Sequence, residues 1–292
     1  MTTETWTTLK LINWTKDYFE KKGIPDARLE AETLLAHALG WKRIDLYSRF
    51  EAAVPSEKLA VFRQMVKRRA KREPPQYILG ETEFCGLTLK TDRRALIPRP
   101  ESELIIEAAA GLARDLDQPL IADIGTGAGN LAIAAAVRLP KARIVACDIS
   151  EEALALAREN AGRHNVLARI DLRLGDFEDT LAEFAGRVDI LMANPPYVAE
   201  QELAGLAPEL REHEPVVALV SGPEGTEHET RILGLAGRLL TPGGHLVMEI
   251  AAGQAERVRK MVADQPALKF IGFEKDFALI ERVVVVRRKV GG

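Results

Sequence analysis

Apolar residues recur at helical spacing through the first quarter of the chain. Trp6, Leu9, Ile12 and Phe19 share one face of a helix, and glycine and proline at 23–25 interrupt the pattern. Four helices are expected, over 5–22, 26–39, 41–50 and 56–72, with Asp26 capping the second helix and Gly40 ending it. Residues 1–73 should therefore form a small helical bundle with one apolar face per helix.

A linker is expected after this bundle, beginning at Pro74 and Pro75. Residues 77–97 alternate apolar and polar side chains around Gly80 and Gly86, which is typical of a β-hairpin. Residues 74–100 are therefore predicted to form a β-hairpin linker between two domains.

From residue 101 onward, apolar strand-like runs alternate with longer amphipathic segments. This alternation predicts an α/β domain with a mostly parallel, doubly wound sheet. Few residues join the last two strands, so they should pair antiparallel. Residues 101–292 are thus expected to hold a seven-stranded sheet with an antiparallel last strand. The expected strands are 120–124, 143–148, 170–174, 188–193, 245–250, 269–274 and 282–287, and the expected helices are 130–139, 151–165, 177–185, 227–240 and 254–263.

Charge is divided unevenly between these parts. The 292 residues carry a net charge of −3, but residues 1–75 hold 15 Lys and Arg against 10 Asp and Glu, and the remainder holds 25 against 33. The acidic sheet domain argues against a protein that clamps long stretches of nucleic acid. The basic cluster at 67–72 is either a surface for an anionic partner such as RNA or, more commonly for such runs, a solvated helix end.

Several other classes find no support in the sequence. Cys85 and Cys147 lie in no Cys/His cluster, so they are interpreted as buried thiols and no metal site is expected. The first ten residues lack the features of a signal peptide, and no apolar run approaches the roughly 18 residues of a membrane span. A cytoplasmic monomer that binds neither a membrane nor a specific nucleic acid sequence is expected.

A glycine-rich turn joins the first expected strand of the sheet to the first helix. Residues 123–129 read Asp-Ile-Gly-Thr-Gly-Ala-Gly, and glycines let the backbone pass close to a ligand at the N-terminus of a helix. The spacing is not that of a dinucleotide fingerprint, which would place a glycine at Asn130, and the Lys-Ser/Thr of a nucleoside-triphosphate loop is missing.

Acidic residues stand at the ends of the next two expected strands, at the sheet edge where α/β proteins bind ligands. Asp148 lies 19 residues after Gly129, where a carboxylate can accept both ribose hydroxyls of a nucleoside. Asp176 offers an acceptor for an adenine amine, and Phe177 offers an apolar ring for the base plane. Each acidic residue alone is equally well a strand-end cap, but their order at successive strands favours a nucleoside site.

The fourth expected strand ends in Asn194-Pro195-Pro196-Tyr197. Both prolines fix the backbone and lack a ladder donor, so the loop should be stiff and present an amide and carbonyls at the ligand-binding edge. Two acceptors there would hold both hydrogens of a planar NH2 group beside the ring of Tyr197. Asn-Pro is also a common turn signal, so the tetrapeptide alone leaves a plain strand-ending turn open.

Together these segments resemble the release-factor glutamine N5-methyltransferases, a family of class I S-adenosylmethionine-dependent methyltransferases. The resemblance spans nearly the whole chain and is carried by residues 74–89, 96–103 (LIPRPESE), 122–129 (ADIGTGAG), 145–150 (VACDIS), 194–197 (NPPY), 242–250 and 281–286. It implies a methyltransferase sheet, S-adenosylmethionine as the cofactor, and class I peptide chain release factors as partners, methylated on the glutamine of their Gly-Gly-Gln motif. The N-terminal helical domain would help to dock that partner.

The pattern and the resemblance together assign the site residues. The expected catalytic residues are Asn194, Pro195, Pro196 and Tyr197. The expected cofactor contacts are Asp123, Gly125, Thr126, Gly127, Ala128, Gly129, Asp148, Ile149, Asp176, Phe177 and Asn194. The Asn194 side-chain oxygen and the Pro195 carbonyl would accept the two N–H groups of the substrate amide, and Tyr197 would pack on the amide plane or wall the pocket. Arg99, Glu101 and Glu103 stand out only by resemblance, and either shape the pocket entrance or pin the linker.

Two departures from the family pattern and three rival functions stay open. Thr226 replaces a leucine and Leu279 a glycine, and Leu279 puts the backbone of its turn in question. NPPY also serves methyltransferases of adenine N6 in DNA or RNA, but the acidic sheet domain speaks against them. A ribosomal-protein glutamine methyltransferase and a catalytically silent cofactor-binding protein are the other rivals. No general base is expected, and His213 and His245 are interpreted as surface or packing residues.

Overall fold

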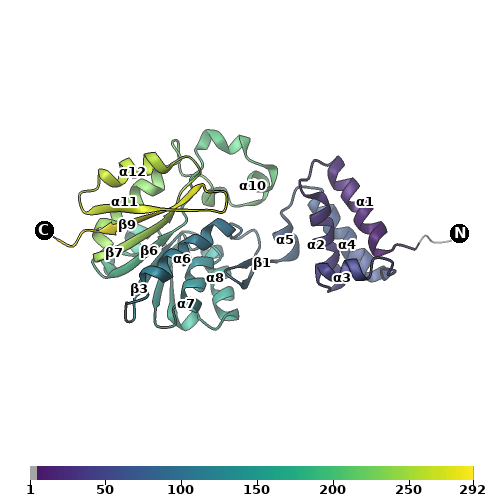
Figure 1. Ribbon diagram of the computed structural model, residues 1–292, viewed down its shortest axis with the longest axis horizontal. Helices are drawn as coiled ribbons and strands as arrows, with labels where there is room; N and C mark the ends of the chain where they lie inside the picture. Colours follow the sequence, from purple (N-terminus) through teal and green to yellow (C-terminus); the bar gives the residue numbers. More distant parts are fainter. Residues whose placement is uncertain (1–4, 292) are drawn as a thin grey trace. The chain divides into compact units, whose positions relative to one another are not determined.

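The computed structural model describes residues 5–291, which fall into two compact units (Figure 1). The first unit ends at Gly80 and also includes the inserted segment Ala207–His213, whereas the second comprises Glu81–Leu206 and the chain from Glu214 onward. Residues 1–4, which belong to the stretch without signal-peptide features, lie outside the described residues. Within residues 5–291, no helix is long and apolar enough to cross a membrane.

The first unit is a bundle of helices, as the apolar spacing predicts. Its helices are α1 (Thr8–Lys21), α2 (Ala27–Leu39), α3 (Arg43–Ser48), α4 (Ser56–Arg69), α5 (Pro75–Leu79) and α10 (Pro208–His213). The buried side chains of Phe19, Leu34 and Phe62 join α1, α2 and α4 in one core. Asp26 precedes α2, but its left-handed backbone, with a φ of 49°, leaves the helix without the side-chain cap that the sequence predicts.

The arginines at the end of α4 are paired inside this unit. Arg69 is only 1% exposed and donates to Glu30 and to Glu209, and Arg72 donates to the other oxygen of Glu209 at 2.9 Å. A buried charge is tolerated only when it is paired. Arg69 and Arg72 therefore fix the inserted helix α10 to the bundle. Lys67, Arg68 and Lys71 of the same basic cluster are exposed, and for them both interpretations stay open.

The predicted hairpin begins later than expected, because residues 75–79 form α5. Arg68 donates to Glu73 at 2.8 Å and to the carbonyl of Tyr77 at 3.0 Å, which fixes this short helix against α4. The predicted hairpin range overlaps α5 only at residues 77–79, and three residues are too few to distinguish a helical period from a strand period. Tyr77 and Ile78 are buried in this one helical turn. The hairpin itself consists of β1 (Glu81–Phe84) and β2 (Leu87–Lys90), paired antiparallel.

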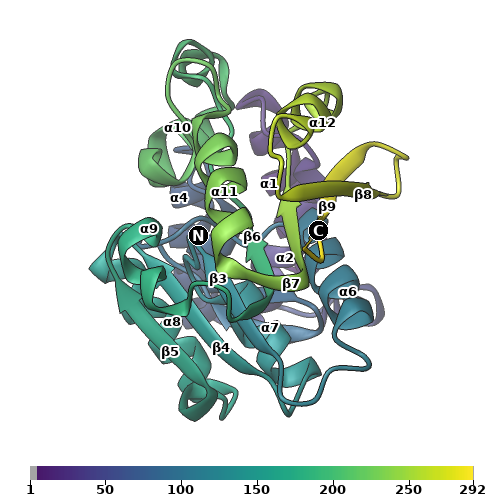
Figure 2. The same cartoon turned by 90° about the vertical axis from the view of Figure 1, so that its left-hand side faces the viewer.

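The second unit is built on a seven-stranded sheet in the order β5-β4-β3-β6-β7-β9-β8 (Figure 2). Only β9 runs antiparallel to its neighbours, so the predicted fold class is confirmed. The strands are β3 (Leu120–Ile124), β4 (Arg143–Asp148), β5 (Ile170–Leu174), β6 (Val188–Ala193), β7 (Leu240–Glu249), β8 (Leu268–Lys275) and β9 (Glu281–Arg288). The strand order reverses between β3 and β6, which is where open α/β sheets bind ligands.

Helices cover both faces of this sheet because strand side chains alternate between two cores. Ile121 and Ile144 point into the core that includes α6 and α7. Ala122 and Val145, one position further along each strand, belong to the core that includes α11 and α12. The helices of this unit are α6 (Glu103–Leu112), α7 (Asn130–Arg138), α8 (Glu151–Arg163), α9 (Phe177–Thr180), α11 (Glu227–Leu239) and α12 (Ala255–Ala263), with 3-10 turns at Pro100–Ser102, Leu167–Arg169, Ala182–Phe184, Glu200–Gly205 and Val216–Ala218.

The turn between β8 and β9 contains the departure at Leu279. Leu279 adopts a φ of 60°, in the left-handed region that favours glycine, and its side chain is 77% exposed. The carboxylate of Asp276 holds the turn by accepting the backbone N–H groups of Ala278 at 2.9 Å and Ile280 at 3.0 Å. The turn thus keeps a conformation suited to glycine although a leucine occupies it.

Candidate active site

A pocket lies at the carboxyl ends of β3, β4, β5 and β6, beside the reversal of strand order. Its lining comes from the loops after these strands, from the segment after the hairpin, and from α11. Among the predicted residues, those that line it are Gly125, Gly127, Asp148, Ile149, Asp176, Phe177, Asn194, Pro195 and Pro196. The predicted residues outside the lining are Asp123, Thr126, Ala128, Gly129 and Tyr197.

The glycine-rich loop after β3 is held against the end of β4. The N–H of Gly127 donates to a carboxylate oxygen of Asp148 at 2.9 Å. Gly129 has a φ of 83°, and a Cβ there would lie 2.9 Å from Cδ1 of Ile133 and 3.1 Å from Cβ of Ala157. Gly125 and Gly127 therefore form the pocket wall, whereas Gly129 permits the close packing of α7 on α8.

Asp123 supports the glycine loop from beneath. It is fully buried, and its Oδ2 accepts from the hydroxyl of Thr126 at 2.7 Å and from the N–H of Ala132 at 3.2 Å. Its Oδ1 has no partner among the described residues. Burial raises the pKa of this carboxyl to about 7. Asp123 thus joins the loop to the first turn of α7, and the N–H of Thr126 joins it to the carbonyl of Cys147 in β4 at 3.0 Å.

Asp148 presents a carboxylate at the end of β4. Its Oδ2 accepts from Gly127, and its Oδ1 accepts from the N–H of Ser150 at 2.9 Å. Burial raises the pKa of this carboxyl above its ordinary value, while the backbone donors oppose that change. Each carboxylate oxygen has a further lone pair, so Asp148 can accept two more hydrogen bonds from a ligand.

A charged pair that no local sequence pattern indicates lies at the end of β5. Arg231 donates to both oxygens of Asp176 at 2.8 Å, and its guanidinium lies 4.5 Å from the ring centroid of Phe177. Burial would raise the pKa of Asp176, but the hydrogen bonds from Arg231 hold it below its ordinary value. Arg231 covers one face of the ring and takes acceptor positions that the sequence assigns to an adenine amine. Arg231 and His228, both from α11, line the pocket.

The NPPY loop leaves the sheet beside β7. Ala193 is the register partner of Met248, so Asn194 emerges at the same edge as the last residue of β7. The Nδ2 of Asn194 donates to the hydroxyl oxygen of Ser102 at 2.9 Å. Tyr197 is half-buried, and burial together with the charge of Glu249 raises the pKa of its hydroxyl to about 12.

Backbone contacts fix the chain that follows this loop. Val198 exchanges hydrogen bonds with Leu219 and Ser221, each at 2.9 Å. Gly225 approaches the same segment with a φ of 73°, and a Cβ there would lie 2.9 Å from the carbonyl oxygen of Tyr197 and 3.0 Å from the nitrogen of Ala199. Only glycine allows this approach, so Gly225 helps to set the position of the NPPY loop.

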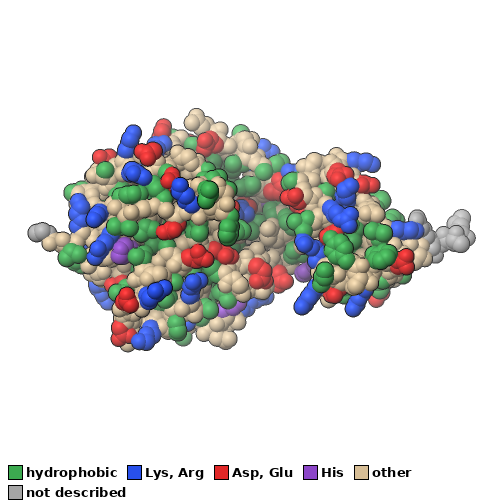
Figure 3. Space-filling model, in the orientation of Figure 1, with side chains coloured by type: hydrophobic (Ala, Val, Ile, Leu, Met, Phe, Trp, Pro, Cys, Tyr) green, Lys and Arg blue, Asp and Glu red, His purple; other side chains and the backbone are tan. Residues whose placement is uncertain are grey.

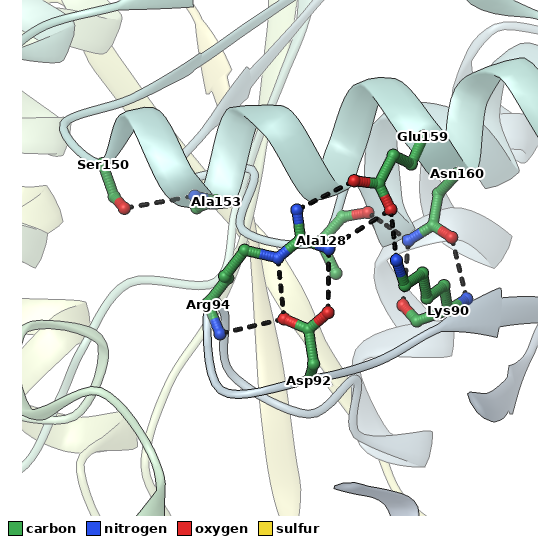
Figure 4. A network of polar contacts seen from close by, with 8 residues as sticks. All are labelled: Lys90, Asp92, Arg94, Ala128, Ser150, Ala153, Glu159 and Asn160. Carbon is green, nitrogen blue, oxygen red and sulfur yellow. Dashed lines mark hydrogen bonds and ion pairs between the residues drawn. The ribbon is translucent and has the colours of Figure 1, made fainter. Parts of the chain in front are cut away.

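The linker after the hairpin is tied to the glycine loop through α8 (Figure 4). The fully buried side chain of Asn160 accepts from the N–H of Lys90 at 2.8 Å and donates to the carbonyls of Lys90 and Ala128, both at 3.0 Å. This one amide therefore joins strand β2 to the loop that borders the pocket.

Arg94, which lines the pocket, is fixed from both sides in the same network (Figure 4). Its guanidinium donates to Asp92 at 2.8 Å and to Glu159 at 2.9 Å. Hydrogen bonds from Arg94 and Lys90 lower the pKa of Glu159 to about 2. The segment that carries Arg94 and Ala95 is thereby held at the pocket wall.

Contacts of the LIPRPESE segment favour a role in fixing the linker. Arg99 forms an ion pair with the buried carboxylate of Glu214, which also accepts from the N–H of Ile97 at 3.2 Å. Glu103 accepts from the N–H of Cys85 at 2.8 Å and so holds the hairpin turn against the start of α6.

Both cysteines are free thiols; Cys147 is buried as expected, whereas Cys85 is only partly buried, and burial raises the pKa of both to about 12. Across residues 5–291, no group of three or more His, Cys, Asp or Glu side chains could hold a metal ion.

Comparisons with known proteins agree with this architecture. A family model described as the PrmC N-terminal domain matches residues 10–80, and one described as a methyltransferase domain matches residues 120–282. The solved structure of the hMettl16 catalytic domain in complex with a MAT2A 3'UTR hairpin is similar with a TM-score of 0.56 and 15% identity, over 80% of this chain and 82% of that one, which concerns the fold alone.

Curated relatives match over nearly their whole length. The release factor glutamine methyltransferase of Geobacter sulfurreducens is 45% identical, over 88% of this chain and 89% of the relative. That of Rhodopirellula baltica is 38% identical over 97% of both chains. The human MTRF1L release factor glutamine methyltransferase is 34% identical, over 96% of this chain and 87% of its own. On this similarity and on its fold, the chain belongs to the release factor glutamine methyltransferase family.

Proposed function

We propose that this protein transfers the methyl group of S-adenosylmethionine to the side-chain nitrogen of the glutamine in the Gly-Gly-Gln motif of class I peptide chain release factors. The observation that carries the proposal is the orientation of Asn194. Its NH2 group is held by Ser102, so its carbonyl oxygen is left to accept a hydrogen from a substrate amide. Family membership supports the choice of substrate. We expect the protein to act as a monomer in the cytoplasm.

The residues of the pocket suit S-adenosylmethionine. Asp148 retains two acceptor positions for ribose hydroxyls, and Phe177 and Ile149 offer apolar surface to a purine. Gly125 and Gly127 let the backbone approach a ligand closely. When bound, S-adenosylmethionine supplies a methyl group activated by the positive sulfonium.

Orientation of the substrate amide is the main task of the chain's own residues. An amide nitrogen is a poor nucleophile because its lone pair is delocalised into the carbonyl. We assign the side-chain oxygen of Asn194 and the carbonyl of Pro195 as acceptors of the two N–H groups, which fixes the direction of the nitrogen's reacting face. Such positioning supplies roughly 7–11 kcal/mol in well-aligned intramolecular reactions.

No general base is required in this mechanism. An N-methylated, protonated amide is acidic enough to release its proton to water. His213 and His245, the histidines considered from the sequence, do not line the pocket.

The test offers three substrates separately with radiolabelled S-adenosylmethionine: a class I release factor, a ribosomal protein preparation and DNA. Label on the release factor, located by mass spectrometry on the motif glutamine, is the expected result. A release factor whose motif glutamine is replaced by alanine is the control and should stay unlabelled. Label confined to DNA or to a ribosomal protein would overturn the proposal.

A DNA substrate is disfavoured by the charge of the sheet unit. On the face drawn in Figure 3, acidic and basic side chains are intermixed over that unit rather than gathered into a basic area. Binding to nucleic acid backbone requires a concentrated positive surface.

A further inference from the structure

Three polar side chains from distant parts of the sequence form one hydrogen-bonded chain at the NPPY loop. The Nδ2 of Asn194 donates to Ser102 at 2.9 Å, and the hydroxyl of Ser102 donates to Oε2 of Glu249 at 2.5 Å. Ser102 is fully buried and Glu249 is 3% exposed. Buried polar groups of this kind are costly unless they are satisfied, so their connection calls for a physical role.

The fold explains why the three groups meet. Asn194 follows β6 and Glu249 ends β7, and these parallel neighbours emerge in register because Ala193 is paired with Met248. Ser102 ends the 3-10 turn that leads into α6, and α6 packs against β6 and β7. A serine at this position therefore reaches both strand ends at once.

The chain of donors has one direction when Glu249 is ionised. A carboxylate can only accept, so the proton of the Ser102 hydroxyl must point to Glu249. The hydroxyl oxygen of Ser102 can then only accept a hydrogen bond from Asn194, and only the NH2 group of the Asn194 amide can donate one. The opposite end, the Oδ1 of Asn194, is thereby turned away from Ser102 on a residue that lines the pocket, and no hydrogen bond among the described residues reaches it.

We propose that Ser102 and Glu249 are positioning residues for methyl transfer, which dictate that Asn194 presents its oxygen rather than its NH2 group to the substrate amide. The kinetic consequence of this inference rests on the proposed function. If the side chain of Asn194 were turned the other way, its NH2 group would face the NH2 group of the substrate glutamine, and neither could accept a hydrogen bond. The orientation of Asn194 itself is a property of the protein alone and can be tested without substrate.

Protonation of Glu249 allows the chain to reverse. A protonated carboxyl can donate to Ser102, whose own proton is then free to turn to Asn194 and favour the amide oxygen at that end. Burial raises the pKa of Glu249 to about 7; the hydrogen bond from Ser102 and the positive charges of Arg99 and Arg282 oppose this rise, and the negative charge of Glu101 adds to it. Tyr197 also lies near Glu249, but its pKa of about 12 keeps it neutral in this range.

The first readout is the Asn194 side-chain amide signal in proton–nitrogen NMR spectra of the full chain, assigned by its loss in Asn194→Ala. In the wild type we expect this signal to titrate with an apparent pKa near that of Glu249. In Ser102→Ala and in Glu249→Gln the titration should disappear. A purely structural Ser102 would lower stability and leave the titration in place, and that result, or a wild-type signal that does not titrate, would overturn the inference.

The second readout is the rate of methyl transfer to a release factor across the same pH range. Ser102→Ala should lower kcat about tenfold at alkaline pH, the order of one lost hydrogen bond, with the Kd of S-adenosylmethionine unchanged by calorimetry. The wild-type rate should fall as pH drops through the pKa of Glu249, and Glu249→Gln should remove that dependence. Unchanged kcat in Ser102→Ala would refute the kinetic role. Absence of transfer by the wild type, with the NMR titration intact, would instead contradict the proposed function and leave the orientation of Asn194 supported.

Discussion

Replacement of Gly225 by alanine tests whether the NPPY loop is held by a close backbone approach. The added Cβ would lie 2.9 Å from the carbonyl oxygen of Tyr197 and 3.0 Å from the nitrogen of Ala199, and both are backbone atoms that no rotamer change can move. Gly86, in the turn of the hairpin, has the same φ of 73° but nothing within 4 Å of its would-be Cβ. Gly86→Ala is therefore a matched control for the backbone strain alone.

The unfolding free energies of the two variants should differ by the cost of the steric contact. In both variants an alanine in the left-handed region lowers the unfolding free energy by on the order of 1 kcal/mol. Gly225→Ala should lose about 1–3 kcal/mol more, the usual cost of overpacking. A loop displacement approaching 1 Å at a site that positions a reacting group lowers the rate by about a hundredfold.

Denaturant unfolding, calorimetry with S-adenosylmethionine and single-turnover methylation of a release factor measure these effects. Gly225→Ala should lose rate while largely keeping cofactor affinity, because the glycine loop and Asp148 are unaltered. Gly86→Ala should keep both. Equal unfolding free energies and equal rates in the two variants would refute the idea that Gly225 fixes the loop.

Three further changes follow from other parts of the second unit. Asp148→Ala should weaken S-adenosylmethionine binding about tenfold or more in calorimetry, since charged hydrogen bonds are lost, and unchanged affinity would remove its assignment to the ribose. Leu279→Gly should raise the unfolding free energy by about 0.5–1 kcal/mol, because Leu279 is exposed at a φ of 60°, and a loss of stability would contradict this. Burial raises the pKa of Glu229 from 4.5 to about 7, so the native state should lose on the order of 3 kcal/mol as pH rises between those values. Glu229→Gln should flatten that slope in unfolding measured against pH, and an unaltered slope would disprove the assignment.

Much of the sheet could be predicted because its strands are continuous apolar runs with clear ends. The strands 120–124, 143–148, 170–174 and 188–193 have the predicted bounds in the structure. Helix α6 is not among the helices expected from the sequence, although its buried residues Ile105, Ile106 and Ala109 lie on one helical face. Helix α10 was missed because its six residues pack with a unit that lies far away in sequence.

Some residues of the site could be predicted from local sequence, whereas others are brought there only by contacts between distant segments. Gly125, Gly127, Asp148 and Asn194 each stand at or just after the end of a predicted strand, so topology alone brings them to one edge. Arg231 meets Asp176 across 55 residues, a pairing that no local pattern reveals. Ser102 likewise gave no local signal.

Glu249 did leave a signal in the sequence. It is a carboxylate inside the apolar run HLVMEI at a strand end, and a buried charge there indicates a partner or a function. That partner, Ser102, lies 147 residues away in the sequence, so only the structure identifies it.

The most direct test of the amide-orienting role of Asn194 is single-turnover methylation of a class I release factor by Asn194→Ala, with cofactor affinity measured on the same preparation. We predict a rate loss of about a hundredfold or more, as for a mispositioned reacting group, with the Kd of S-adenosylmethionine largely kept. Transfer to the motif glutamine at close to the wild-type rate would contradict the claim that this side chain orients the substrate amide.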